Sequence, residues 1–74
     1  MKHILAVLNR AQRDRLRTEK AEIDVRRKTL QTFVDAPEFT GLPWEQRTLL
    51  SDQLGIMDEY SAVLGQRIDM EKQV

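Results

Sequence analysis

The residues that break helices gather in one short stretch near the middle of the chain. Both prolines, Pro37 and Pro43, lie there, and Gly41 lies between them. Proline cannot continue a helix, and it disfavours helical geometry in the residue before it, so one helix cannot run through this stretch. The 74-residue chain therefore divides into two segments of similar length, each with room for one long helix.

The segment before the break carries apolar residues at the spacing of an amphipathic helix. Leu16, Ile23 and Leu30 recur every seven residues, and Phe33 and Val34 close the same face. This periodicity predicts one long helix that ends before Pro37. The apolar residues 4–8 leave room for a short extra helical segment at the N-terminus.

The segment after the break predicts a second helix with an unusually wide apolar arc. Pro43 fits the first position of a helix, and Glu45 places negative charge near the positive end of the helix dipole. Two apolar rows follow at seven-residue spacing, one made of Leu50, Met57 and Leu64 and the other of Leu49, Ile56, Val63 and Met70. A single partner helix covers a narrower face than this. We therefore predict that the second row is an interface between copies of the chain.

These patterns predict an all-α fold, an antiparallel two-helix hairpin that forms a single domain over residues 1–74. We expect a helix over about 4–34, a loop over 35–42 and a helix over about 43–70. A chain this short buries only about 60 % of its unfolded surface, and it has no cysteine for a disulfide. We therefore expect the hairpin to assemble into a homo-oligomeric helical bundle. The apolar loop residues Phe39, Leu42 and Trp44 are expected to cap one end of it.

Charge is divided between the two segments. Residues 1–34 hold nine Lys and Arg against four Asp and Glu, and residues 35–74 hold three against eight. Opposite charge favours antiparallel docking of the two helices and equally favours association of copies. The N-terminal apolar run is too short for a signal peptide or a membrane span, so we expect a cytoplasmic protein that does not bind membranes.

Two sets of polar residues lie where a purely structural bundle would carry apolar ones. Glu19 and the cations Lys20, Arg26 and Arg27 fall between the apolar positions of the first helix. A second set, Gln53, Tyr60 and Arg67, forms a polar row inside the apolar arc of the second helix. The cations either pair locally and reach water along their stems, or form a basic groove for phosphate. In the second case, Tyr60 would add a ring face and Gln53 an amide.

The sequence lacks the motifs of common enzymes. It has no Gly-rich phosphate loop, no nucleophile with a plausible base and no pair of His or Cys at metal-ligand spacing, and its one histidine is His3. We therefore predict no catalysis, no cofactor and no metal site. The arginines at residues 10–17 point around the helix rather than along one face, and the acidic second segment would repel a polyanion, so we do not expect nucleic-acid binding. A structural or adaptor oligomer that binds another protein remains the alternative to ligand binding.

The chain resembles a group of small helical-hairpin proteins encoded by bacteriophages and prophages. The resemblance rests on four stretches, Leu16–Lys20, Leu30–Val34, Phe39–Pro43 and Leu49–Ile68. This group is similar to the hairpin-type phage sponges that oligomerise and sequester nucleotide signals of the CBASS and Thoeris immune systems. The chain lacks the Gly-Tyr-Arg element that anti-CBASS sponges carry near their N-terminus, so none of their binding residues is transferred to it.

The resemblance implies a phage anti-defence protein in the cytoplasm of an infected bacterium, and the structural or adaptor alternative would then bind a host or phage protein. It would bind a host nucleotide immune signal, either a cyclic ADP-ribose isomer or a cyclic oligonucleotide, and sequester it without cleavage. A ligand with a base and phosphates needs cationic donors beside a stacking surface. The residues predicted to bind it are Lys20, Arg26, Arg27, Gln53, Tyr60 and Arg67.

Overall fold

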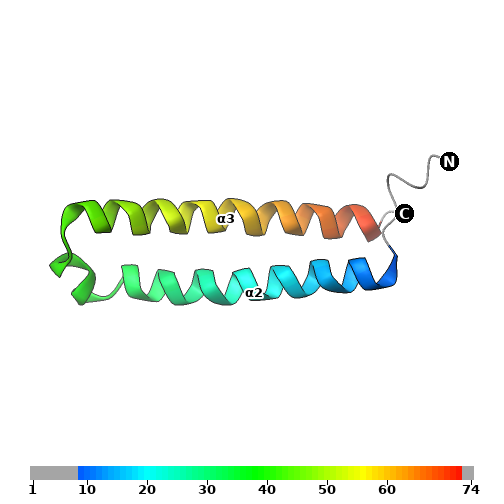
Figure 1. The fold of residues 1–74 in the computed structure, drawn as a ribbon, viewed down its shortest axis with the longest axis horizontal. Helices are drawn as coiled ribbons and strands as arrows, with labels where there is room; N and C mark the ends of the chain where they lie inside the picture. Colours follow the sequence, from blue (N-terminus) through cyan, green and yellow to red (C-terminus); the bar gives the residue numbers. More distant parts are fainter. Residues whose placement is uncertain (1–8, 73–74) are drawn as a thin grey trace.

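The computed structural model describes residues 9–72, in which two long helices lie side by side and run antiparallel (Figure 1). α2 spans Arg10–Val34, the short 3-10 helix η1 spans Pro37–Gly41, and α3 spans Trp44–Lys72. The molecule is elongated, with extents of 55 × 17 × 16 Å. The predicted all-α class with two long helices is confirmed, since the described residues form no strand. The expected extra helical segment before Asn9 lies outside these residues, and assembly of copies stays a prediction.

Local hydrogen bonds fix both ends of α2. The Asn9 side chain accepts a hydrogen bond from the Gln12 backbone at 2.9 Å, and the Gln12 side chain accepts one from the Asn9 backbone at 2.9 Å. This reciprocal capping box satisfies amides that have no partner within the helix. At the other end, the Asp35 backbone amide donates to the Gln31 carbonyl at 3.0 Å. Pro37 then prevents the helix from continuing.

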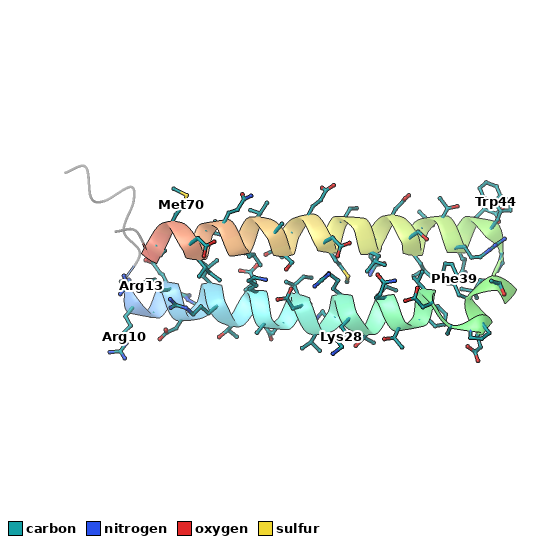
Figure 2. All side chains as sticks on the ribbon, turned by 180° about the vertical axis from the view of Figure 1, so that it is seen from behind. Arg10, Arg13, Lys28, Phe39, Trp44 and Met70 are labelled. Carbon is teal, nitrogen blue, oxygen red and sulfur yellow. The ribbon has the colours of Figure 1, made fainter. Side chains whose placement is uncertain are left out.

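The connection between the helices packs one aromatic residue inward and leaves another in solvent. Phe39 of η1 is buried and meets the ring of Phe33 edge to face, with ring centres 6.0 Å apart. Trp44 is 65 % exposed and points away from α2 (Figure 2). The prediction that Trp44 caps the hairpin end is therefore wrong. The Pro43 carbonyl accepts the first hydrogen bond of α3, from Arg47, so α3 begins at Trp44 and turns the indole outward.

A heptad seam joins the two helices, but few of its side chains are fully covered. Among the described residues, the buried apolar side chains are Leu16, Phe39, Leu54 and Leu64, and Leu64 is the only one with no exposed surface. The other apolar residues of the seam are half-buried, namely Ile23, Leu30, Val34, Leu50, Met57 and Ile68. Their positions step by three and four residues along each helix, as in a coiled coil. The seam also contains polar residues, and these build the first of two distinct polar surfaces.

Candidate functional site

Three polar residues form a closed cluster at the middle of the seam. The Lys20 ammonium donates to Asp24 Oδ2 at 2.9 Å and to Ser61 Oγ at 3.0 Å, and the Ser61 hydroxyl donates to Asp24 Oδ1. Ser61 is 7 % exposed and occupies a seam position of α3. Gly65, one turn further along α3, lies against the lysine stem, and a Cβ there would be in ordinary van der Waals contact with Lys20 Cε at 3.4 Å. The charge of Lys20 is thus neutralised within the hairpin.

Arg27 forms a second polar link between the helices. Its Nη1 donates to Asp58 Oδ1 at 2.9 Å, and its Nε lies 3.9 Å from Asp24 Oδ1. That Nε is buried without a hydrogen-bond partner. Together these five residues, Lys20, Asp24, Arg27, Asp58 and Ser61, form the cross-helix network. Because Lys20 and Arg27 already have acidic partners, local pairing accounts for both of these predicted ligand-binding residues.

The cross-helix network makes stability depend on pH. The Ser61 hydrogen bond, followed by the Lys20 hydrogen bond, holds the pKa of Asp24 below its usual 3.8. The folded state therefore keeps this carboxylate ionised to lower pH than the unfolded chain does. The stability that the group contributes is present above pH 3.8 and is lost as the pH falls through the lower folded-state pKa.

We therefore expect Asp24→Asn to lower the melting temperature at neutral pH, and we expect its difference from wild type to shrink below pH 3.8. Thermal unfolding followed by circular dichroism over a pH series measures this difference. Glu22→Gln is the matched control, since Glu22 is an exposed acid of the same helix, and it should change little at any pH. An Asp24→Asn deficit that is equally large at neutral and strongly acid pH would contradict the assignment.

Glu19 and Arg26 do not lie in the seam, so their predicted positions between the apolar residues of the interface are wrong. Both are exposed, whereas Lys20 and Arg27 are half-buried. The seam follows alternating steps of four and three residues from Leu16, and each neighbouring position is turned by about 100° around the helix. Glu19 and Arg26 are therefore rotated out of the interface toward one flank.

That flank carries an open hollow formed by both helices. The hollow has a volume of about 290 Å³ and is lined by Gln12, Arg15, Leu16, Glu19 and Arg67. It brings two arginines from different helices to the same place. The sequence predicted a ligand-binding role for Arg67 but not for Arg15, because the arginines at residues 10–17 point around the helix. Arg15 lies beside the seam residue Leu16 and opposite Arg67. This placement can be recognised only once the register of the two helices is known.

The heptad repeat extends this flank along the hairpin. Seven-residue steps from Glu19 lead to Arg26 and Phe33 on α2, and steps back from Arg67 lead to Tyr60 and Gln53 on α3. Glu19 and Arg67 both line the hollow. Because the helices are antiparallel, these steps place Arg26 at the level of Tyr60 and Phe33 at the level of Gln53. These residues are exposed, and Tyr60 is 40 % exposed. We call this surface the polar face, comprising Gln12, Arg15, Glu19, Arg26, Phe33, Gln53, Tyr60 and Arg67.

The structure thus separates the six predicted ligand-binding residues into two groups. Lys20 and Arg27 belong to the cross-helix network, whereas Arg26, Gln53, Tyr60 and Arg67 belong to the polar face. Asp24 and Glu19, one from each surface, project about 140° apart around α2. The two groups therefore use different surfaces. Lys20 and Arg27 lie in the seam and bond to Asp24 and Asp58 on one flank, whereas the polar face lies on the other flank.

A second hollow lies at the connected end of the hairpin. It has a volume of about 360 Å³ and is lined by Phe39, Trp44, Arg47, Thr48, Ser51 and Asp52.

The described residues contain no group of three His, Cys, Asp or Glu side chains placed to hold a metal ion. Neither α2 nor α3, as far as each is described, has an apolar stretch long enough to cross a membrane.

Comparison with known proteins identifies one family. The family model named Sequestin matches residues 11–70, which include nearly all of α2 and α3 and their connection. No curated protein and no solved structure matches the chain. The family name suggests that its members sequester a ligand. Because the match covers most of the sequence, the chain belongs to the Sequestin family.

Proposed function

We propose that this protein binds a small nucleotide immune signal and sequesters it without cleaving it. In this proposal, the ligand is a cyclic ADP-ribose isomer or a cyclic oligonucleotide, and the protein acts for a bacteriophage in the cytoplasm of the infected bacterium. Membership of the Sequestin family supports sequestration. The resemblance to phage-encoded hairpin sponges supports the class of ligand and the biological role.

The observation that carries the proposal is the meeting of Arg15 and Arg67 at the open hollow. Arginine offers a planar set of donors that matches the oxygens of a phosphate. Both ligand classes carry at least two phosphate groups, so two arginines from different helices suit them better than one. Arg26 and Arg67 are exposed, and neither forms an ion pair with another described residue, which leaves both available to an anion.

Tyr60 and Gln53 extend this surface with groups that suit a base. The ring of Tyr60 is partly exposed and lies at the level of Arg26 along the hairpin. An aromatic face of this kind can stack on a purine. Gln53 supplies an amide that can both donate and accept hydrogen bonds. The polar face therefore combines cationic donors with a stacking surface, the mixture that a nucleotide ligand requires.

The same surface gives little support to catalysis. The hollow is lined by one carboxylate, Glu19, and contains no serine, cysteine or histidine that could act as a nucleophile or base. The hollow is open to solvent, whereas the electrostatic interactions that stabilise a transition state are strongest in sites that exclude water. We therefore propose that bound ligand leaves the protein chemically unchanged.

Recovery of the ligand tests this proposal. Purified protein is titrated calorimetrically with cyclic ADP-ribose isomers and cyclic dinucleotides, and the compound that binds is then released by heat denaturation and identified by mass spectrometry. We expect one class to bind and to return with its original mass. A hydrolysed product would show an enzyme instead, and absence of binding across the panel would refute nucleotide sequestration.

A structural or adaptor oligomer is the second candidate function. The observation that favours it is the outer row of α3, Leu49, Ile56, Val63 and Met70, which is 49–67 % exposed. A protein partner seated on this row would account for its apolar character without any ligand. The calorimetric panel separates the two candidates, because an adaptor predicts no nucleotide binding.

A further inference from the structure

The outer row of α3 has the geometry of a second helix-packing seam. Leu49, Ile56, Val63 and Met70 are spaced by seven residues and lie on the side of α3 turned away from α2, as Figure 2 shows for Met70. The row extends for about 32 Å at 1.5 Å per residue. The α2 helix has no such row on its outer side, where Val25 is the one large exposed apolar residue apart from Phe33.

The hairpin by itself has a small hydrophobic core. Four apolar side chains are buried among the described residues, and the other apolar residues of the seam are only half-buried. Chains of this size without disulfides or metals commonly reach stability by association. A second copy of the same chain necessarily brings a matching apolar row of equal length, which makes it a self-complementary partner.

We propose that α3 packs against α3 of a second copy in antiparallel orientation, and that this dimer completes the ligand site. An antiparallel pair with its twofold axis near Tyr60 sets Leu49 opposite Met70 of the second copy and Ile56 opposite Val63. It sets Arg67 opposite Gln53. A parallel pair would instead place Arg67 against Arg67 of the second copy, and like charges facing each other are destabilising.

The second copy would enlarge a site that one chain leaves small. The hollow at Arg15 and Arg67, at about 290 Å³, is at the lower end of the range for ligand pockets. The outer row borders the α3 part of the polar face, because Gln53, Tyr60 and Arg67 lie three or four residues from its members. Antiparallel packing would therefore bring Gln53 of the second copy beside Arg67 and form two equivalent sites per dimer. The ligand part of this inference rests on the proposed function.

Light scattering on purified protein tests the interface. Wild type is expected to have twice the mass of a single chain, and Ile56→Glu is expected to halve it. Val25→Glu is the matched control, since Val25 is 65 % exposed and Ile56 is 66 % exposed, and it should leave the dimer intact. Circular dichroism checks that both variants remain helical. A wild-type monomer at micromolar concentration, or dissociation by both variants alike, would overturn the proposal.

Cross-linking tests the orientation, since the natural chain has no cysteine. Under mild oxidation, Leu49→Cys alone should give little disulfide-linked dimer. A mixture of Leu49→Cys and Met70→Cys should give the linked heterodimer. Efficient linking of Leu49→Cys to itself would show a parallel pair and contradict the antiparallel arrangement.

Ligand titration of the monomeric variant separates this inference from the proposed function. If wild type binds a cyclic nucleotide and Ile56→Glu binds it at least tenfold more weakly, the composite site is supported. If Ile56→Glu is monomeric and binds as tightly as wild type, the composite site is wrong while sequestration stands. If wild type is a dimer that binds no member of the panel, sequestration fails while the α3 interface stands.

Discussion

Leu64→Ala is expected to destabilise the protein more than any other single truncation in the seam, by about 2–5 kcal/mol. Leu64 has no exposed surface and lies in the seam between α2 and α3. Its removal leaves a cavity that two straight helices cannot fill by small movements. A core of this size rarely supplies more than about 3–5 kcal/mol. We therefore expect the variant to be largely unfolded at physiological temperature.

Thermal and urea unfolding at fixed protein concentration measure this loss. Leu64→Met keeps the apolar volume and should cost less than about 1.5 kcal/mol. Val25→Ala removes apolar atoms from an exposed site of α2 and should change stability by roughly 0.5 kcal/mol or less. If Leu64→Ala were no more harmful than Val25→Ala, the seam described above would not be what holds the helices together.

Arg67→Ala is expected to weaken ligand binding roughly 10- to 150-fold, which corresponds to about 1.5–3 kcal/mol for one charge-assisted contact. Arg67 lines the hollow from α3, and Arg15 lines it from α2. It is exposed and lies outside the cross-helix network, so its removal should leave the hairpin folded. Calorimetric titration with the cyclic nucleotide that binds wild type measures the loss.

Two further arginines provide the controls for this prediction. Arg17→Ala removes the same charge from an exposed position of α2 outside the hollow, and it should leave affinity nearly unchanged. Arg27→Ala breaks the link to Asp58, so it should lower the melting temperature while sparing affinity at temperatures where the variant is folded. If Arg27→Ala abolished binding and Arg67→Ala did not, the ligand site would lie on the other flank of the seam.

The sequence predicted the two long helices well because the helix-breaking residues are unambiguous. Pro37 follows the end of α2, and α3 begins one residue after Pro43. Heptad spacing also identified Lys20 and Arg27 as residues close to the interface. Their partners on α3, Ser61 and Asp58, were not predicted, because both pairings depend on the register that the connection imposes. Local periodicity alone does not specify that register.

The incorrect predictions concern residues for which a shift of one position along the chain changes the face of the helix. Arg26 was assigned with Arg27, although it is rotated by about 100° from it and is exposed. Trp44 was expected to cover the hairpin end because it is large and apolar, but its place at the start of α3 turns it into solvent. Arg15 was missed because its significance depends on a residue of the other helix, Arg67.

The separation of the two polar surfaces has an evolutionary consequence. The contacts that align the helices, from Lys20 to Ser61 and from Arg27 to Asp58, share no residue with the polar face. Under the proposed function, substitutions at Arg26, or elsewhere on the polar face, would therefore alter which anion is preferred without disturbing that alignment. A ligand site on this surface would be free to change gradually, because the contacts that hold the two helices together lie elsewhere.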